Sequence, residues 1–447
     1  MNDEPDKSRP MLTTREEFRF LVDLVLQHAT SDHTCIQHQD LHCGTTRFAN
    51  NQIIQNLNLR KVSFSVTSAF GRCHGTASTT DLTAGAVQAT LKQAERIARV
   101  SPEDPEYLPP VEPQRFHCWP TSRPETLAAG PAKRLELARE AVLHCQSKGL
   151  TAAGIVSSSI VNVGIAASTG LFAHEQRTDS QFSLTVQAGK ATGWAAAWHR
   201  SIDHLKVSDR TGMAIEKAHR GENPSEIAPG RYTVILEPSA VAGLLTWLMW
   251  MLDAKSYDKG TSPFSGKLNN PLVDRRLTLR NDPAHPDLLG PGFTHEGLPV
   301  NEVTWIDAGV LKHLDYDRFT AQQHGVVTIP TLESPCLSGE HPPCATVREL
   351  IQNTHRGILV TNFWYIRPVN PTDLTLTGMT RDGTFLIEGG QITKALRNFR
   401  FHDSPLRVFN QVETFTTPHE ATSSETGKLL VPAMKIRNFN FSSVTKF

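Results

Sequence analysis

The sequence predicts an α+β fold of two domains, in which N-terminal helices pack on an antiparallel sheet and a β-rich, barrel-like domain follows. Helical and strand periodicities occupy separate stretches of the first half, which is typical of α+β rather than of alternating α/β folds. In the second half, many short apolar runs are separated by turn residues. A chain of 447 residues is also too long for one ordinary hydrophobic core.

The boundary between the two domains is expected where the apolar periodicity stops. Residues 220–230, RGENPSEIAPG, are polar and contain Pro and Gly, as linkers between domains commonly do. We therefore divide the chain into an N-terminal domain at 1–220 and a C-terminal domain at 221–447.

The first half begins with a predicted amphipathic helix at 13–29, capped by Thr13 or Thr14, because apolar residues recur there at helical spacing. Residues 61–70, KVSFSVTSAF, alternate apolar and polar side chains and predict a half-buried strand. Helical spacing returns at 78–100. Five prolines in the next thirteen residues, SPEDPEYLPPVEP, favour an extended connector on the surface.

Further elements follow in the same manner. Residues 125–148 predict another helix, and 151–199 are rich in expected strands. The second half opens with the strand YTVILE and the apolar helix 240–252, AVAGLLTWLMWML, in which Thr246 is the one polar side chain. In IDAGVL and IEGGQI, Gly stands between apolar runs, which indicates β-hairpins.

Composition argues against several classes of function. The 45 basic and 45 acidic residues balance, so no net charge attracts the chain to nucleic acid or to anionic lipid. No apolar run reaches the length of a membrane span, and the polar N-terminus has no signal core. Seven cysteines without a CxxC pair fit a reducing compartment. We therefore expect a cytoplasmic protein that binds neither nucleic acid nor membrane.

Two clusters of histidine and cysteine are candidates for metal sites. In HTCIQHQDLHC, His38 and His42 would lie ~13 Å apart on one strand, too far to share one zinc ion. The loop CLSGEHPPC contains Cys336, His341 and Cys344, but its spacing matches no standard zinc finger. A surface loop is the simpler interpretation, although a metal site there stays open. The chain contains no GxSxG, GxxxxGK[ST], GxGxxG or HExxH motif.

Several longer segments occur in a recognisable order. Residues 46–82 contain R-F-A-N-N-x-I and end in G-x-A-S-T-x-D-L, and SPEDPEYLPP follows the next predicted helix. The second half contains KGTSPFSGKLNNPLVDRRLTLRNDP, HEGLPVNEVTWIDAGVLKHLDYDRFTAQQHG, RGILVT and FLIEGGQI. From about residue 15 to the end, the chain resembles the TldD/PmbA (TldE) family.

The resemblance identifies the apolar helix with the metal-binding helix of the family. TldD-type subunits carry HExxxH there and a cysteine near the C-terminus. In this chain, Thr246 and Met251 occupy the two histidine positions, Trp247 the glutamate position, and Thr426 the cysteine position. A thioether and neutral hydroxyls are poor ligands for a catalytic zinc, and tryptophan is no general base. The resemblance therefore implies no catalytic residue and no metal in this chain.

The resemblance further implies a TldE/PmbA-type subunit that pairs with a TldD-like metallopeptidase. Zinc would belong to that HExxxH-bearing partner alone, and the pair would enclose a chamber for proteolysis or maturation of unfolded peptides. Thr246, Trp247, Trp250 and Met251 are then candidate chamber-lining residues, with plain core packing as the alternative. Two other functions stay open, namely a homodimeric peptide-binding scaffold and a hydrolase with a relocated metal site at 336–344. The sequence does not identify the peptide.

Overall fold

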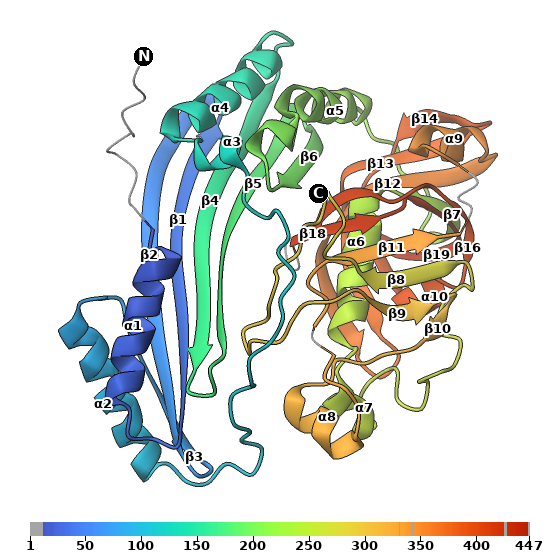
Figure 1. The fold of residues 1–447 in the computed structure, drawn as a ribbon. Coiled ribbons are helices and arrows are strands. Elements are labelled where there is room, and N and C mark those ends of the chain that lie inside the picture. Colours follow the sequence, from blue (N-terminus) through green and yellow to red (C-terminus); the bar gives the residue numbers. More distant parts are fainter. Residues whose placement is uncertain (1–11, 330, 341–343, 424–426, 446–447) are drawn as a thin grey trace.

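The computed structural model describes residues 12–329, 331–340, 344–423 and 427–445 of the chain. The first half forms one six-stranded antiparallel sheet in the order β3-β2-β1-β4-β5-β6. Its strands are β1 His33–Ala49, β2 Gln52–Phe70, β3 Cys73–Thr79, β4 Thr151–Ala167, β5 Phe172–Ala188 and β6 Ala191–His199. Figure 1 shows these long strands side by side, with β6 nearest the second half of the chain.

Helices cover this sheet at its two ends (Figure 1). They are α1 Arg15–His28, α2 Ala84–Val100, α3 Pro124–Leu127, α4 Pro131–Gln146 and α5 Val207–Arg220, with a 3-10 turn at Ile202–Leu205. Phe18 of α1 and Leu91 of α2 belong to one apolar core, whereas Val142 of α4 and Phe182 of β5 belong to another. Because side chains alternate along a strand, the neighbours of Phe182 point to the other face, where they stay half-buried.

The second half contains two further sheets. The first has the order β12-β7-β19-β15-β13-β14, and β16 pairs with β19. Since β12 pairs with both β7 and β13, five of these strands close into a ring, and the sheet is barrel-like. Its strands are β7 Gly230–Leu236, β12 Arg356–Asn370, β13 Thr375–Glu388, β14 Gln391–Ala395, β15 Phe399–Asp403, β16 Val412–Phe415 and β19 Met434–Val444.

The other sheet of the second half has the order β10-β9-β8-β11-β18-β17. Its strands are β8 Leu277–Asn281, β9 Val303–Asp307, β10 Val310–Leu311, β11 Pro335–Gly339, β17 His419–Ser423 and β18 Gly427–Val431. Helix α6, Pro238–Trp250, contacts strands of both sheets and is surrounded by the largest apolar core. The remaining helices are α7 Ala254–Asp258, α8 Arg318–His324, α9 Val347–Gln352 and α10 Pro405–Val408.

The structure confirms the predicted fold class and most of the predicted elements. Thr14 caps α1 and forms a capping box with Glu17. Both expected hairpins are present, joining β9 to β10 and β13 to β14. Their turns place Gly309 and Gly390 at positive φ, as tight hairpin turns require. No helix was predicted over α5, although its buried residues recur at helical spacing.

The domain boundary stays a prediction. It falls between the end of α5 at Arg220 and the start of β7 at Gly230. Within the described ranges, no helix is both long and apolar enough to cross a membrane.

Candidate functional site, an aromatic cleft

Helix α6 occupies the position where the sequence placed a metal-binding helix. Pro238 begins its first turn, and a nearly unbroken apolar sequence allows it to be buried on several sides. Thr246 is 1% exposed, and its hydroxyl donates a hydrogen bond to the carbonyl of Ala242 at 2.9 Å. The polar group at this position is thus buried and hydrogen-bonded.

The remaining expected site residues lie in different surroundings. Trp247 is half-buried, while Trp250 is 44% exposed, and their rings meet edge to face at 5.1 Å. Met251, half-buried, follows the helix as its C-cap and packs against the main apolar core. Of the four candidate lining residues, Trp247 is the one that borders the neighbouring cavity. Thr246 is buried within this chain, and its place in a chamber formed with a partner stays a prediction. Thr426 lies outside the described residues.

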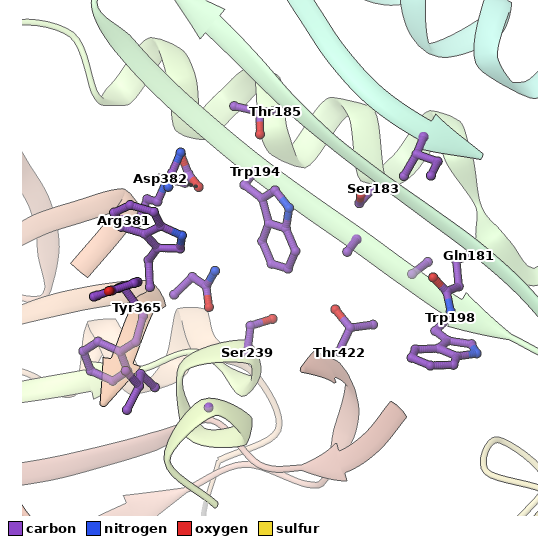
Figure 2. Close-up of a pocket in the computed structure, with 18 of the residues that line it drawn as sticks. Gln181, Ser183, Thr185, Trp194, Trp198, Ser239, Tyr365, Arg381, Asp382 and Thr422 are labelled. Atoms are coloured by element: carbon purple, nitrogen blue, oxygen red, sulfur yellow. Dashed lines mark ion pairs between the residues drawn. The ribbon is translucent and has the colours of Figure 1, made fainter. Parts of the chain in front are cut away.

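The cavity beside α6 is a cleft of about 650 Å³ between the two halves of the chain. β5 and β6 form one wall, and α6, β12, β13 and Thr422 form the other (Figure 2). Four of the seven tryptophans line it, namely Trp194, Trp198, Trp247 and Trp364, and Trp250 packs on Trp247. We call this space the aromatic cleft. Its volume is typical of small-ligand and peptide side-chain pockets.

The sheet wall of the aromatic cleft is a ladder of paired side chains. Trp198 lies opposite Gln181, Ala196 opposite Ser183, and Trp194 opposite Thr185. The two tryptophans are four residues apart along β6, which corresponds to ~13 Å. Ala196 and Ser183, which lie between them, have small side chains and also line the cleft. The indole N–H of Trp198 donates to Asp179, a carboxylate whose pKa is raised by burial although Arg200 lies 3.1 Å away.

The opposite wall is built by irregular backbone. The pairing of β12 with β13 shifts register between Val360 and Asn362 and again between Trp364 and Arg367. Tyr365 has a φ of 55° and Asp382 a φ of 56°. Such bulges bend a strand and redirect its side chains, and strained backbone of this kind occurs preferentially at functional sites. Here the bulge leaves Trp364 and Tyr365 46% and 55% exposed.

Two arginines accompany these exposed rings. The guanidinium carbon of Arg381 lies 4.4 Å from the centre of the Trp364 ring, and that of Arg367 lies 4.3 Å from the Tyr365 ring. Both distances are typical of cation–π contacts. The one acidic residue of the described lining, Asp382, accepts a hydrogen bond from Thr192 at 2.7 Å and lies 3.6 Å from Arg381.

The described lining of the aromatic cleft combines aromatic rings with uncharged polar groups, one carboxylate and two arginines. No histidine, cysteine, glutamate or lysine is found among its described lining residues. In the described part of the chain, no three His, Cys, Asp or Glu side chains are grouped so that they could hold a metal ion. The cleft therefore offers stacking surfaces, hydroxyl and amide groups, and two cations.

The other histidine and cysteine candidates are dispersed. His38 lies on β1, as predicted, where it is buried, stacks on Phe18 at 5.5 Å and has a pKa lowered to about 4 by burial. Cys336 and Cys344 are both buried but belong to different apolar clusters. Burial raises the pKa of the Cys336 thiol. His341 lies outside the described residues.

Sequence reasoning missed most of the cleft. It singled out Trp247 but not the cleft residues on β5, β6, β12 and β13. The sequence feature that marks the cleft lies in WAAAW at 194–198 and FWYIR at 363–367. Several large aromatic residues occur close together there, and they line the cleft. These segments are far apart in sequence, so their proximity depends on the fold.

Comparison with known proteins agrees with this architecture. The model of the PmbA/TldA metallopeptidase C-terminal domain matches residues 229–443, and that of the central domain matches 124–220. The chain belongs to the PmbA/TldD family. No curated protein matches it in sequence.

Three solved structures have the same fold. TldE from Thermococcus kodakarensis is 18% identical, with a TM-score of 0.83 over 94% of this chain and 98% of that chain. A proposed modulator of DNA gyrase from Thermotoga maritima is 17% identical, with a TM-score of 0.84 over 95% and 99%. A similarly described protein from Bacteroides thetaiotaomicron is 17% identical, with a TM-score of 0.81 over 96% and 98%.

Proposed function

We propose that this chain is a non-catalytic, TldE-type subunit that pairs with a TldD-like metallopeptidase and binds the unfolded peptide that the partner cleaves or matures. One observation carries the proposal. The helix in the position of the metal-binding helix presents a buried threonine, a half-buried tryptophan and a methionine where the family motif has histidine, glutamate and histidine.

The aromatic cleft supports a role in peptide binding. Large aromatic rings bury much surface with few rotatable bonds, which is why tryptophan and tyrosine are frequent at binding sites. Gln181, Ser183 and Thr185 offer side-chain hydrogen-bonding groups for a peptide backbone on the sheet wall. Because no acid–base pair accompanies them in the described lining, these groups would hold a peptide without cleaving it.

The proposal assigns zinc to the partner alone and places the pair in the cytoplasm. All seven cysteines are free thiols, which fits a reducing compartment. The test is co-expression with a TldD-like subunit encoded by the same genome, followed by co-purification, elemental analysis and peptide cleavage assays. We expect a stable pair with zinc in proportion to the partner. Failure of the two chains to associate would contradict the proposal.

A homodimeric peptide-binding scaffold is the second candidate. It is favoured by one observation, namely that both walls of the aromatic cleft come from a single chain. Mass measurement in solution, with and without the TldD-like subunit, distinguishes the two functions. A homodimer that persists at equimolar TldD-like subunit would favour the scaffold.

A further inference from the structure

We infer that the aromatic cleft selects peptide segments in which a carboxylate stands next to an aromatic or other apolar residue. The carboxylate is either an acidic side chain or a free C-terminus. The inference rests on the proposed peptide-binding function and specifies its substrate class.

The first argument is the charge at the cleft wall. Arg367 and Arg381 line the cleft together with one carboxylate, that of Asp382. Asp382 is 7% exposed and already engaged by Thr192 and by Arg381. Among the residues that the structure describes, Arg367 makes no ion pair, and its Nη1 donates to the carbonyl of Ile366 at 2.7 Å. One positive charge is therefore left over for a ligand.

Second, both guanidinium groups lie over aromatic rings. A guanidinium that stacks on a ring uses the faces of its plane and leaves its N–H groups, which lie in the plane, available as donors. The guanidinium carbon of Arg381 lies over the Trp364 ring and that of Arg367 over the Tyr365 ring, and the centres of the two rings are 5.7 Å apart. Planar pairs of donors of this kind match the two oxygens of a carboxylate.

The third argument is the strain that holds these groups in place. Tyr365 lies in the left-handed region, which is unfavourable for a bulky residue, and the bulge around it brings Trp364 and Arg367 to the cleft. Gly378 is tightly enclosed by Phe401 and Ile366 beneath this strand. A backbone that is fixed in this way orients the cations before a ligand arrives, which reduces the entropy cost of binding.

The remaining lining residues indicate which kind of side chain stands next to the carboxylate in the bound peptide. Between Trp194 and Trp198, the small side chains of Ala196 and Ser183 leave space for one apolar or aromatic side chain. Figure 2 shows Trp194, Ser239 and Thr422 pointing into the same space from both walls. A peptide that places a carboxylate at the arginines can therefore place an adjacent ring between the tryptophans.

Single-stranded nucleic acid is the rival ligand, because it also combines negative charge with stacking. Sequence-independent binding of nucleic acid requires a positively charged groove that follows several phosphates. One uncompensated charge in the cleft and a balanced chain of 45 basic and 45 acidic residues do not provide such a groove. The observations therefore favour a peptide.

The test is fluorescence anisotropy with the full-length chain and labelled, unstructured decapeptides. All three peptides contain one tryptophan, and they differ in the residue next to it or in their C-terminal group. The first has glutamate and an amidated C-terminus, the second has glutamine and an amidated C-terminus, and the third has glutamine with tryptophan as the last residue and a free carboxylate. A single-stranded DNA decamer is the fourth probe. Loss of charge-assisted hydrogen bonds lowers affinity about tenfold, so we expect the second peptide to bind about tenfold more weakly than the first.

The third peptide distinguishes a C-terminal from a side-chain carboxylate. The double variant Arg367→Gln/Arg381→Gln should abolish the preference for carboxylates. Arg19→Gln is the matched control, since Arg19 stacks on Phe172 at 3.5 Å outside the cleft and should leave affinity unchanged. Thermal melting verifies that each variant is folded.

Four results would overturn the inference. The first is equal affinity for all three peptides, and the second is no binding of any of them. The third is a carboxylate preference that persists in the double variant. The fourth is tighter binding of DNA than of the glutamate peptide. None of them affects association with a TldD-like subunit. Co-purification therefore reports separately on the proposed function.

Discussion

Replacing Thr246 by histidine, as if to restore the first ligand of the family motif, should destabilise the fold. The side chain is 1% exposed and belongs to the most deeply buried part of α6. Enlarging a side chain in a packed core costs ~1–3 kcal/mol. A buried imidazole with an unmet hydrogen bond costs ~1–3 kcal/mol more. The combined loss of ~2–6 kcal/mol is large against a total stability of ~5–15 kcal/mol.

The assay is a thermal melt of Thr246→His beside wild type and Thr246→Ser. At about 2–4 °C per kcal/mol for a domain of this size, we expect Tm to fall by ~4–24 °C. Thr246→Ser keeps the hydroxyl and loses one methyl group, so it should cost about 1 kcal/mol. Because burial lowers the pKa of the new imidazole below ~6.5, the unfolded state binds the proton more tightly, and the deficit should grow as pH falls below that value.

Two outcomes would refute this reasoning. A Tm equal to that of wild type would mean that position 246 has room for a polar ring. A Tm that rises on addition of zinc would mean that other residues near α6 already form part of a metal site. Either result would remove the main support for a non-catalytic subunit.

Three further predictions follow. Elemental analysis should find no stoichiometric zinc in the purified chain, and about one zinc per chain that is lost in Cys336→Ser would contradict this. The chain alone should not cleave unfolded peptides, and chelator-sensitive cleavage by the isolated chain, free of contaminating protease, would refute that expectation. Since burial lowers the pKa of His38 and His199 to about 4, stability should be complete above pH ~6.5 and decrease as pH falls towards 4. Melts of His38→Phe should show a smaller decrease than wild type, and an unchanged pH dependence would show that His38 does not contribute.

Much of the fold could be predicted because local patterns agree with it. The capping residues and apolar spacing of α1 specify that helix, and the positive-φ glycines specify the hairpins of the second half. Helix α5 was missed, since its small and polar residues dilute the apolar spacing that marks its buried face. The closure of the barrel-like sheet depends on pairing of β12 with β7 and β13, distant partners that no local pattern reveals.

The site was predictable in part. An unbroken apolar run correctly indicates that α6 is a core helix. A helix that is apolar on all sides, however, gives no periodic signal to distinguish Trp247, which borders the cleft, from Thr246, which is buried. Trp250 was expected beside them and is 44% exposed. The cleft residues opposite α6 could not be predicted from the sequence, because they become neighbours only when β6 and the β12–β13 bulge meet across the cleft.

The central claim is that this chain contributes peptide binding and the partner contributes catalysis. The most direct measurement is peptide cleavage by the equimolar pair when the glutamate of the partner's HExxxH motif is replaced by glutamine and this chain is wild type. We expect cleavage to be abolished while the pair still assembles and still binds peptide. Cleavage that persists at a rate near that of the unmodified pair would place a catalytic site in this chain and contradict the account.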